Sequence, residues 1–256
     1  IKKMKEITIS LKNNDKAYFL GDFHLGSPDK TQSKKREYKI LSFLNSIESD
    51  LKELFLLGDI FDFWYEYKEV VPKGFTRFLG KISQLSDKGV NIHLILGNHD
   101  MWVLDYFQKE LGINVYDNSI KLKLNNNLLL VGHGDGIGEG DLGYKLLKLI
   151  FKNKILKFLF RWVHPDIGVK LGIYLSKRKK IETKSYSTIN NERIYNYCKK
   201  VEDNTHYDYY IFGHSHQPLE KKINNSSRYI NVGDWIKNSN YLEVDNKEFQ
   251  LKNFRG

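Results

Sequence analysis

The chain has 256 residues, of which 41% are hydrophobic and 14% aromatic, and its formal net charge is +10. This composition excludes an intrinsically disordered chain, and the single cysteine, Cys198, excludes an intrachain disulfide framework and a thiolate metal cluster. Charges interrupt the apolar runs before they reach the roughly 18 to 20 residues of a membrane span. We expect an unexported, folded protein that binds any metal through nitrogen and oxygen.

The first half of the chain alternates short apolar runs with helix-forming segments. The runs 17–20, 54–57 and 92–96 each end in glycine and a polar residue, which is typical of buried strands followed by functional loops. Helices are predicted between them, over 32–46 and 75–88. Because strand and helix alternate, the pattern predicts a largely parallel sheet.

The second half is richer in strands. Two apolar runs flank an asparagine-rich turn within 120–131 and predict a hairpin. Five more strands are expected, joined by turn residues, over 209–212, 220–223, 228–232, 241–244 and 249–254. We expect an α/β fold with a single domain over residues 1–256 and a basic, amphipathic helical cap, residues 141–200, inserted within it.

The positive charge is concentrated in one segment. Residues 141–200 hold 15 basic and 4 acidic residues, and the remainder holds 26 basic and 27 acidic residues. Within the segment, residues 144–163 mix large apolar side chains with lysines and predict an amphipathic helix. Its apolar face either lies at a membrane interface among anionic lipids or packs on the core beneath a solvated polar face. No nucleic-acid partner is expected, because no nucleic-acid-binding motif accompanies the charge.

Five motifs follow apolar runs and carry the candidate functional residues: Gly21-Asp22-Phe23-His24, Gly58-Asp59-Ile60-Phe61-Asp62, Gly97-Asn98-His99-Asp100, Gly132-His133-Gly134-Asp135 and Gly213-His214-Ser215-His216. Asp22 and His24 are two residues apart, so on an extended segment their side chains point the same way and can share one ion. The same argument applies to His214 and His216. Carboxylate, amide oxygen and imidazole suit manganese, iron or zinc, and two such ions can clamp a phosphoryl group during hydrolysis. The motifs therefore predict a hydrolase of phosphate esters or anhydrides.

In this order, the motifs resemble the calcineurin-like metallophosphoesterase superfamily from Asp22 to Trp235. The resemblance implies a four-layered α/β/β/α sandwich. It also implies two metal ions bridged by Asp59, with these further ligands: Asp22, His24 and His216 on one ion, and Asn98, His133 and His214 on the other. His99 matches a histidine that contacts the phosphoryl oxygens or protonates the leaving group, and Asp100 is expected to orient it.

A narrower resemblance rests on Phe61-Asp62-Phe63-Trp64, on His133-Gly134-Asp135 followed by Asp141, on the basic cap and on Gly233-Asp234-Trp235. These features are similar to the UDP-2,3-diacylglucosamine pyrophosphohydrolase family of lipid A biosynthesis. That family implies hydrolysis of UDP-2,3-diacylglucosamine to UMP and 2,3-diacylglucosamine 1-phosphate (lipid X), with Mn²⁺ as the expected metal and Zn²⁺ or Fe²⁺ as alternatives. A metallophosphoesterase of another nucleotide or phospholipid is the alternative function.

The narrower resemblance also implies where the partners bind. Five residues are expected to contact substrate: Asn98, His99, Asp141, His214 and Arg178. Asp141 would contact the sugar or its amide-linked chain, and Arg178 would face phosphate or the membrane. The implied partners are a UDP-linked diacylated sugar lipid and, through the cap, a membrane surface. The protein is expected to be peripheral, at the cytoplasmic face of the inner membrane, with no protein partner.

Overall fold

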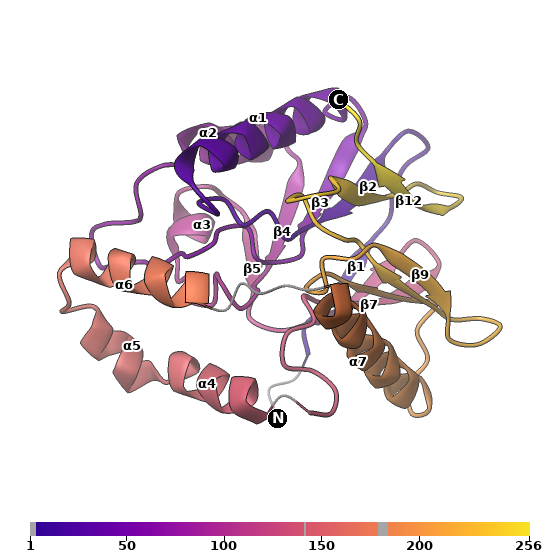
Figure 1. Ribbon diagram of the computed structural model, residues 1–256. Coiled ribbons are helices and arrows are strands. Elements are labelled where there is room, and N and C mark those ends of the chain that lie inside the picture. The colour runs from indigo at the N-terminus through magenta and orange to yellow at the C-terminus, as the bar shows by residue number, and fades with distance from the viewer. Residues whose placement is uncertain (1–3, 141, 179–183) are drawn as a thin grey trace.

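The computed structural model describes residues 4–140, 142–178 and 184–256, which contain two six-stranded sheets (Figure 1). The first sheet has the order β12-β11-β2-β3-β4-β5. Its strands are β2 (Lys16–Leu20), β3 (Leu51–Leu56), β4 (Asn91–Ile95), β5 (Asn114–Tyr116), β11 (Asn240–Val244) and β12 (Phe249–Asn253). Strands β2 to β5 pair in parallel, which confirms the parallel sheet predicted from the alternation of strands and helices.

The second sheet has the order β1-β6-β7-β8-β10-β9. Its strands are β1 (Glu6–Ile9), β6 (Ile120–Leu124), β7 (Asn127–Val131), β8 (Tyr209–Phe212), β9 (Leu219–Lys222) and β10 (Arg228–Asn231). The antiparallel β6–β7 hairpin is confirmed. Strand β1, which pairs in parallel with β6, and the short β5 were not among the predicted elements.

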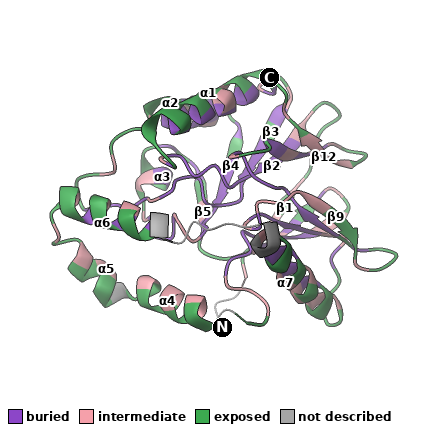
Figure 2. Cartoon of the chain, in the orientation of Figure 1, coloured by how far each residue is buried: buried purple, intermediate pink, exposed green. Residues whose placement is uncertain are grey.

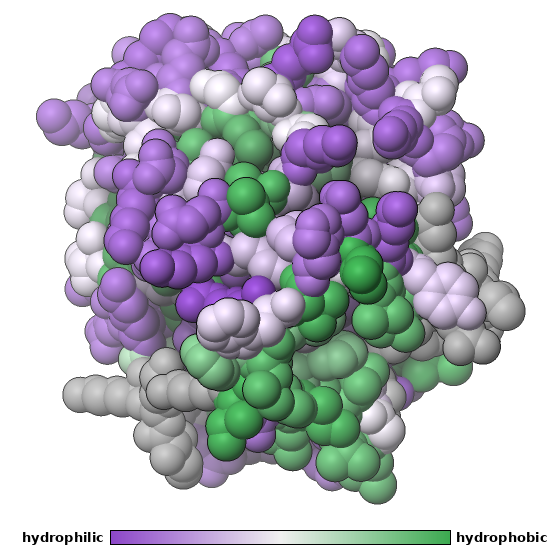
Figure 3. All heavy atoms as spheres, turned by 90° about the vertical axis from the view of Figure 1, so that its left-hand side faces the viewer, coloured by the Kyte–Doolittle hydropathy of each residue, from purple (hydrophilic) through white to green (hydrophobic). Residues whose placement is uncertain are grey.

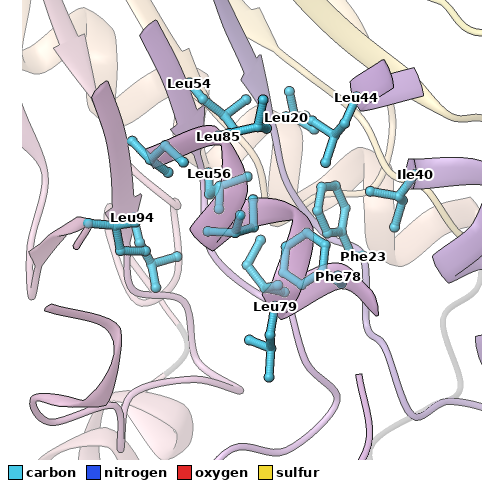
Figure 4. Close-up of a cluster of buried hydrophobic side chains, with 14 of the residues drawn as sticks. Leu20, Phe23, Ile40, Leu44, Leu54, Leu56, Phe78, Leu79, Leu85 and Leu94 are labelled. Carbon is cyan, nitrogen blue, oxygen red and sulfur yellow. The ribbon is translucent and has the colours of Figure 1, made fainter. Parts of the chain in front are cut away.

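Helices cover the outer faces of both sheets. The first sheet packs against α1 (Lys30–Ser46), α2 (Thr76–Asp87) and the short α3 (Tyr106–Lys109), through a cluster that includes Leu54, Ile40 and Phe78 (Figure 4). The second sheet packs against α7 (Lys184–Glu202), through Ile194 and Cys198. A third apolar cluster lies between the sheets. The three clusters therefore lie at the three interfaces of a helix–sheet–sheet–helix stack, which confirms the predicted four-layered α/β/β/α sandwich.

The contact between the two sheets is rich in large side chains. Phe19 of β2 stacks on Phe55 of β3 with ring centroids 4.4 Å apart, and both belong to the cluster that contains Val131 of β7 and Ile211 of β8. Burial of such side chains contributes about 1.5–3 kcal/mol each. The contact holds the ends of strands from both sheets in fixed relative positions. The loops that follow these strands are therefore also fixed relative to one another.

Three helices lie beside the sandwich: α4 (Leu142–Lys152), α5 (Lys154–Phe160) and α6 (Pro165–Arg178) (Figure 1). The single helix predicted over 144–163 is therefore divided. Asn153 accepts hydrogen bonds from the backbone nitrogens of Ile155 and Leu156, at 2.9 and 3.2 Å, and begins α5 as its N-cap. Residues 142–178, here called the α4–α6 segment, differ from α7, which packs on the second sheet although it lies in the same basic region.

Helix α4 exposes three of its leucines to solvent. All its residues are described, and none of them is coloured as buried in Figure 2. Leu142, Leu146 and Leu149 are 79%, 62% and 70% exposed. The apolar surface of α4 is therefore divided: Leu147 and Phe151 line a cavity against the sandwich, and the other leucines are exposed. The inner side of α4 carries lysines: Lys145 donates to the backbone oxygen of Gly138. Lys148 and Lys152 likewise donate to the core.

Apolar side chains gather on one face of the molecule (Figure 3). The α4–α6 segment supplies most of the large hydrophobic residues that are exposed, including Ile155, Phe158, Trp162 and Ile167. In the described part of the chain, no helix combines the length and the apolar character that crossing a membrane requires.

Candidate metal centre

The five predicted motifs meet at one end of the sandwich, because each follows a strand whose carboxyl end points there. The strands are β2, β3 and β4 of one sheet and β7 and β8 of the other, and ligand sites of open α/β sheets lie at such ends. Five of the side chains stand on left-handed backbone: Asp22 (φ 53°), His24 (φ 44°), Asp59 (φ 51°), His214 (φ 67°) and His216 (φ 58°). Such conformations are uncommon for residues other than glycine and cluster at functional sites.

The left-handed backbone corrects one expectation. Asp22 and His24 do not lie on an extended segment, and neither do His214 and His216. Their side chains nevertheless converge: the distance from His24 Nε2 to Asp22 Oδ1 is 3.9 Å. The convergence therefore comes from tight turns after the strands rather than from strand alternation.

One group of possible ligands is formed by Asp22, His24, Asp59 and His216. His216 Nε2 lies 3.1 Å from Asp22 Oδ1 and 3.2 Å from His24 Nε2. His24 Nε2 also lies 3.5 Å from Asp59 Oδ2. All four side chains therefore point to a common position, where one ion can contact each of them.

A second group is formed by Asp59, His133 and His214. His133 Nε2 is 3.5 Å from Asp59 Oδ2 and 3.4 Å from Asn98 Oδ1, so the amide oxygen of Asn98 faces the same position. Asp59 belongs to both groups and is placed to bridge two ions. The structure thus brings together all seven residues predicted as metal ligands.

The donor set fits divalent cations. Asp22 is fully buried, and its Oδ1 has no hydrogen-bond partner among the described residues, which is costly for a carboxylate unless a cation is bound. Burial lowers the pKa of both His24 and His214 to about 4, which keeps them neutral as metal ligands must be. Burial also acts to lower the pKa of His133, but Asp59 outweighs it and raises the pKa to about 10. The carboxylates of Asp59, Asp22 and Asp135 therefore favour the protonated form of His133 when no cation is bound.

At two of the motif glycines, Gly58 and Gly97, neighbouring loops approach too closely for any side chain. A Cβ added to Gly58, whose φ is +83°, would lie 2.6 Å from the backbone nitrogen of Gly97 and 2.8 Å from His133 Nδ1. A Cβ on Gly97 would lie 2.2 Å from Asp59 Oδ1. The loops of the centre therefore pack against one another with no room for a side chain at these positions.

His99 lies beside the two ligand groups. Its Nε2 is 3.9 Å from Asp59 Oδ2, and its Nδ1 lies 2.7 Å from the backbone oxygen of Asp62. Because a carbonyl oxygen only accepts hydrogen bonds, Nδ1 carries a proton. Asp100 does not orient this ring, contrary to the expectation: its Oδ2 accepts from the backbone nitrogen of Ile60, and its Oδ1 has no partner in the described chain.

Two positioning residues have roles that the sequence did not reveal. Arg36 of α1 is buried, and its Nη1 donates to the backbone oxygens of Phe23, His24 and Ser27, at 2.9, 2.8 and 3.1 Å. It thereby holds the loop that carries Asp22 and His24. Asp62 Oδ1 lies 3.6 Å from His24 Nδ1, on the side of the ring that faces away from the ligand cluster.

A cavity of about 340 Å³ opens from the centre toward the α4–α6 segment. Asn98 and His99 line its inner end, and the rest of its wall is mainly apolar, with Phe63, Trp102, Leu147, Phe151 and Leu175. Ser176 of α6 also lines it and places its Oγ 3.2 Å from His99 Nδ1. Of the predicted substrate contacts, Asp141 and the side chain of Arg178 lie outside the described residues.

The sequence is similar to those of known proteins. Residues 16–218 match the family described as Calcineurin-like phosphoesterase. The chain is 35% identical to the UDP-2,3-diacylglucosamine hydrolase of Porphyromonas gingivalis, over 93% of this chain and 97% of that protein. It is 28% identical to the proteins of the same name from Shewanella piezotolerans, over 91% and 95% of the two chains, and from Pseudomonas entomophila, over 92% and 97%.

Proposed function

The chain belongs to the calcineurin-like phosphoesterase family, and we propose that it hydrolyses UDP-2,3-diacylglucosamine to UMP and 2,3-diacylglucosamine 1-phosphate (lipid X), a step of lipid A biosynthesis. It is a metal-dependent hydrolase of a phosphoric anhydride. The observation that carries the substrate assignment is the mainly apolar cavity that begins at Asn98 and His99. A diacylated sugar linked to a diphosphate requires this combination of a metal centre and an apolar cavity.

The residues of the centre have different roles in the reaction. When two divalent ions are bound, they neutralise phosphate charge and lower the pKa of bound water. Asp59 holds both ligand groups together, and Arg36 fixes the loop of Asp22 and His24. His99, with its Nδ1 held by the Asp62 carbonyl, turns Nε2 toward the centre, where a proton on it can stabilise a phosphoryl oxygen or the leaving oxygen.

Manganese is our proposal for the metal, with zinc and iron as the alternatives. The ligands are carboxylate oxygens, an amide oxygen and imidazole nitrogens, and this mixture is favourable to manganese while also accepting zinc or iron. Metal analysis of protein purified without added metal, followed by activity after reconstitution with each ion, would decide between them.

The function is tested by following UMP release from UDP-2,3-diacylglucosamine in detergent with Mn²⁺. Each methylene of the substrate's acyl chains that is buried in the cavity contributes about 0.8 kcal/mol. A substrate whose acyl chains are shorter by two buried methylenes should therefore have a kcat/KM about tenfold lower. Leu147→Gln, inside the cavity, should reduce turnover of the lipid but not of a generic phosphodiester, whereas the matched Leu149→Gln on the outer face of α4 should change neither. Equal rates on a deacylated UDP-sugar would contradict the substrate assignment, and activity confined to the generic diester would favour the alternative phosphoesterase.

We further propose that the α4–α6 segment serves as the cap of the site and binds the cytoplasmic face of the inner membrane. The support is the exposure of Leu142, Leu146 and Leu149, together with Trp162, which is 79% exposed. Lys145, Lys148 and Lys152 bond to the core, so apolar contact rather than their charge would provide the attachment.

Sedimentation with phospholipid vesicles tests the membrane proposal. The double variant Leu146→Ser/Leu149→Ser should bind vesicles about tenfold more weakly or worse, since each leucine that enters the interface contributes at least about 1.5 kcal/mol. Val70→Ser, at an exposed apolar residue outside the segment, is the control. Unchanged binding of the double variant would exclude this face as the attachment surface.

A further inference from the structure

A second cavity lies on the other side of α4 from the apolar one. Its volume is about 460 Å³, within the range of small-molecule sites. Within the described ranges it shares no lining residue with the apolar cavity. Its wall is formed by the end of β5, the turn into β6, the loop after β7, and helices α4 and α7.

Both cavities reach the metal centre, but at different ligands. The apolar cavity is lined by Asn98 and His99, whereas the second cavity is lined by His133, Gly134 and Asp135. His133 is a predicted metal ligand that faces Asp59 and Asn98. A molecule bound across the centre can therefore extend into each cavity in a different direction.

The second cavity has polar groups suited to a base in its wall. Asn118, Ser119, Lys148 and the ring of Tyr197 line it. The side chain of Asn118 is exposed and has no hydrogen-bond partner in the described part of the chain, so its amide can both donate and accept. An amide pairs with the alternating donor and acceptor groups on the edge of a pyrimidine, and a tyrosine ring can stack on the face of a base.

Contacts around the cavity hold its wall in place. Tyr116 OH bonds to His93 Nδ1 at 3.0 Å, behind the turn that carries Asn118. Lys148 donates to Asp135 Oδ2 at 2.5 Å, and Lys152 donates to the backbone oxygen of Asp117 at 3.4 Å. The lysine side of α4 thus connects the loop after β7 with the turn between β5 and β6, which holds the cavity wall in a fixed arrangement.

We propose that this cavity is the nucleoside subsite, which takes the uridine of the substrate while the apolar cavity takes its acyl chains. The assignment rests on the proposed function, because it uses the UDP-linked substrate. Lys148 lines the cavity and pairs with Asp135 beside the centre, so it would lie near the phosphate next to the uridine. Helix α4 then separates the two halves of the substrate, with Leu147 on the acyl side and Lys148 on the nucleoside side.

Binding of UMP to the metal-loaded protein tests the proposal without turnover. By calorimetry, Asn118→Ala and Tyr197→Leu should each raise the Kd of UMP about tenfold, the effect expected when a base loses a stacking or edge partner. Ribose 5-phosphate, which lacks the base, should bind the variants and the parent protein equally. Leu147→Gln should show the reverse pattern, with weaker binding of 2,3-diacylglucosamine 1-phosphate and an unchanged Kd of UMP.

Photocrosslinking locates the uracil base of bound UMP directly. UMP carrying 4-thiouracil should label the peptide that contains Asn118 or the one that contains Tyr197. Labelling of the Phe63 or Leu171 peptides, or a Kd of UMP that both variants leave unchanged, would overturn the proposal. If the protein binds UMP in this pattern but does not hydrolyse the UDP-linked lipid, the nucleoside subsite stands and the proposed function fails, so the two failures are distinguishable.

Discussion

In the two-sheet core, leucine and phenylalanine side chains such as Leu54 and Phe55 are buried between layers. In α4 the arrangement is reversed: Leu142 and Leu149 are exposed, and Lys148 bonds to Asp135 of the core. Both regions have amphipathic patterns, yet α4 leaves part of its apolar surface exposed, while Leu147 and Phe151 face the apolar cavity. The comparison teaches that periodicity identifies the two faces of an element, whereas the neighbouring surface decides which face turns inward.

The largest effect is expected from the variant that removes the central carboxylate of the core. Asp59→Ala deletes the residue shared by both ligand groups, so both ions should be lost and kcat should fall by at least about 10³-fold. Metal content by mass spectrometry and UMP release would be measured together, with Asp87→Ala at the exposed end of α2 as the control. Retention of both ions would refute the bridging role.

His99→Ala should have the next largest effect and should separate metal binding from chemistry. The variant should keep its metal, because His99 is not among the seven predicted ligands, and lose about 10²- to 10³-fold in kcat through lost stabilisation of the transition state. The exposed His164→Ala provides the control. Loss of metal as complete as in Asp59→Ala would mean that His99 is a ligand.

Arg36→Met tests how strongly the core depends on buried polar contacts. The substitution leaves three backbone oxygens of the Asp22 loop without their donor, so the free energy of unfolding should fall by at least about 2 kcal/mol. Arg77→Met on the exposed side of α2 should change it little. Urea denaturation measures both, and equal stability of the two variants would show that the Arg36 contacts are dispensable.

The smallest effect is expected on the reversed face of α4. Leu146→Ser/Leu149→Ser removes apolar side chains that are already exposed, so the free energy of unfolding should change by less than about 0.5 kcal/mol. Leu54→Ala in the core should instead cost about 2–5 kcal/mol. A large loss in the double variant would mean that this face is covered within the protein, and the contrast between core and segment would not hold.

Much of the fold and the metal centre follows from the sequence, because each signal is local. A buried run followed by glycine and a polar residue marks both a strand and the loop at its end, and the seven predicted ligands come from five such loops that meet in the structure. Strand β1 was missed because its pairing partner β6 is more than a hundred residues away, and β5 because three residues are too short for a period. The predicted helix over 144–163 is divided at Asn153, whose side chain caps the start of α5. This capping residue is a local signal, but the amphipathic pattern continues across it and favoured one long helix.

The supporting residues of the centre could not be found in this way. Arg36 acts on backbone oxygens and Asp62 holds His99 through its own carbonyl, so neither contact depends on a recognisable pairing of side chains. Asp100 illustrates the reverse error, because the family resemblance implied a contact with His99, whereas its carboxylate accepts from the backbone nitrogen of Ile60. Such contacts are set by how loops fold back on one another.

The left-handed backbone at Asp22, His24, Asp59, His214 and His216 also bears on how the protein can evolve. Each such residue costs about 1 kcal/mol relative to glycine, so the five together cost an amount comparable to the net stability of a small domain. A glycine at any of them would favour folding and remove a ligand. Selection for thermal resistance and selection for turnover therefore oppose each other at these five positions, and stabilising changes should accumulate elsewhere in the sandwich.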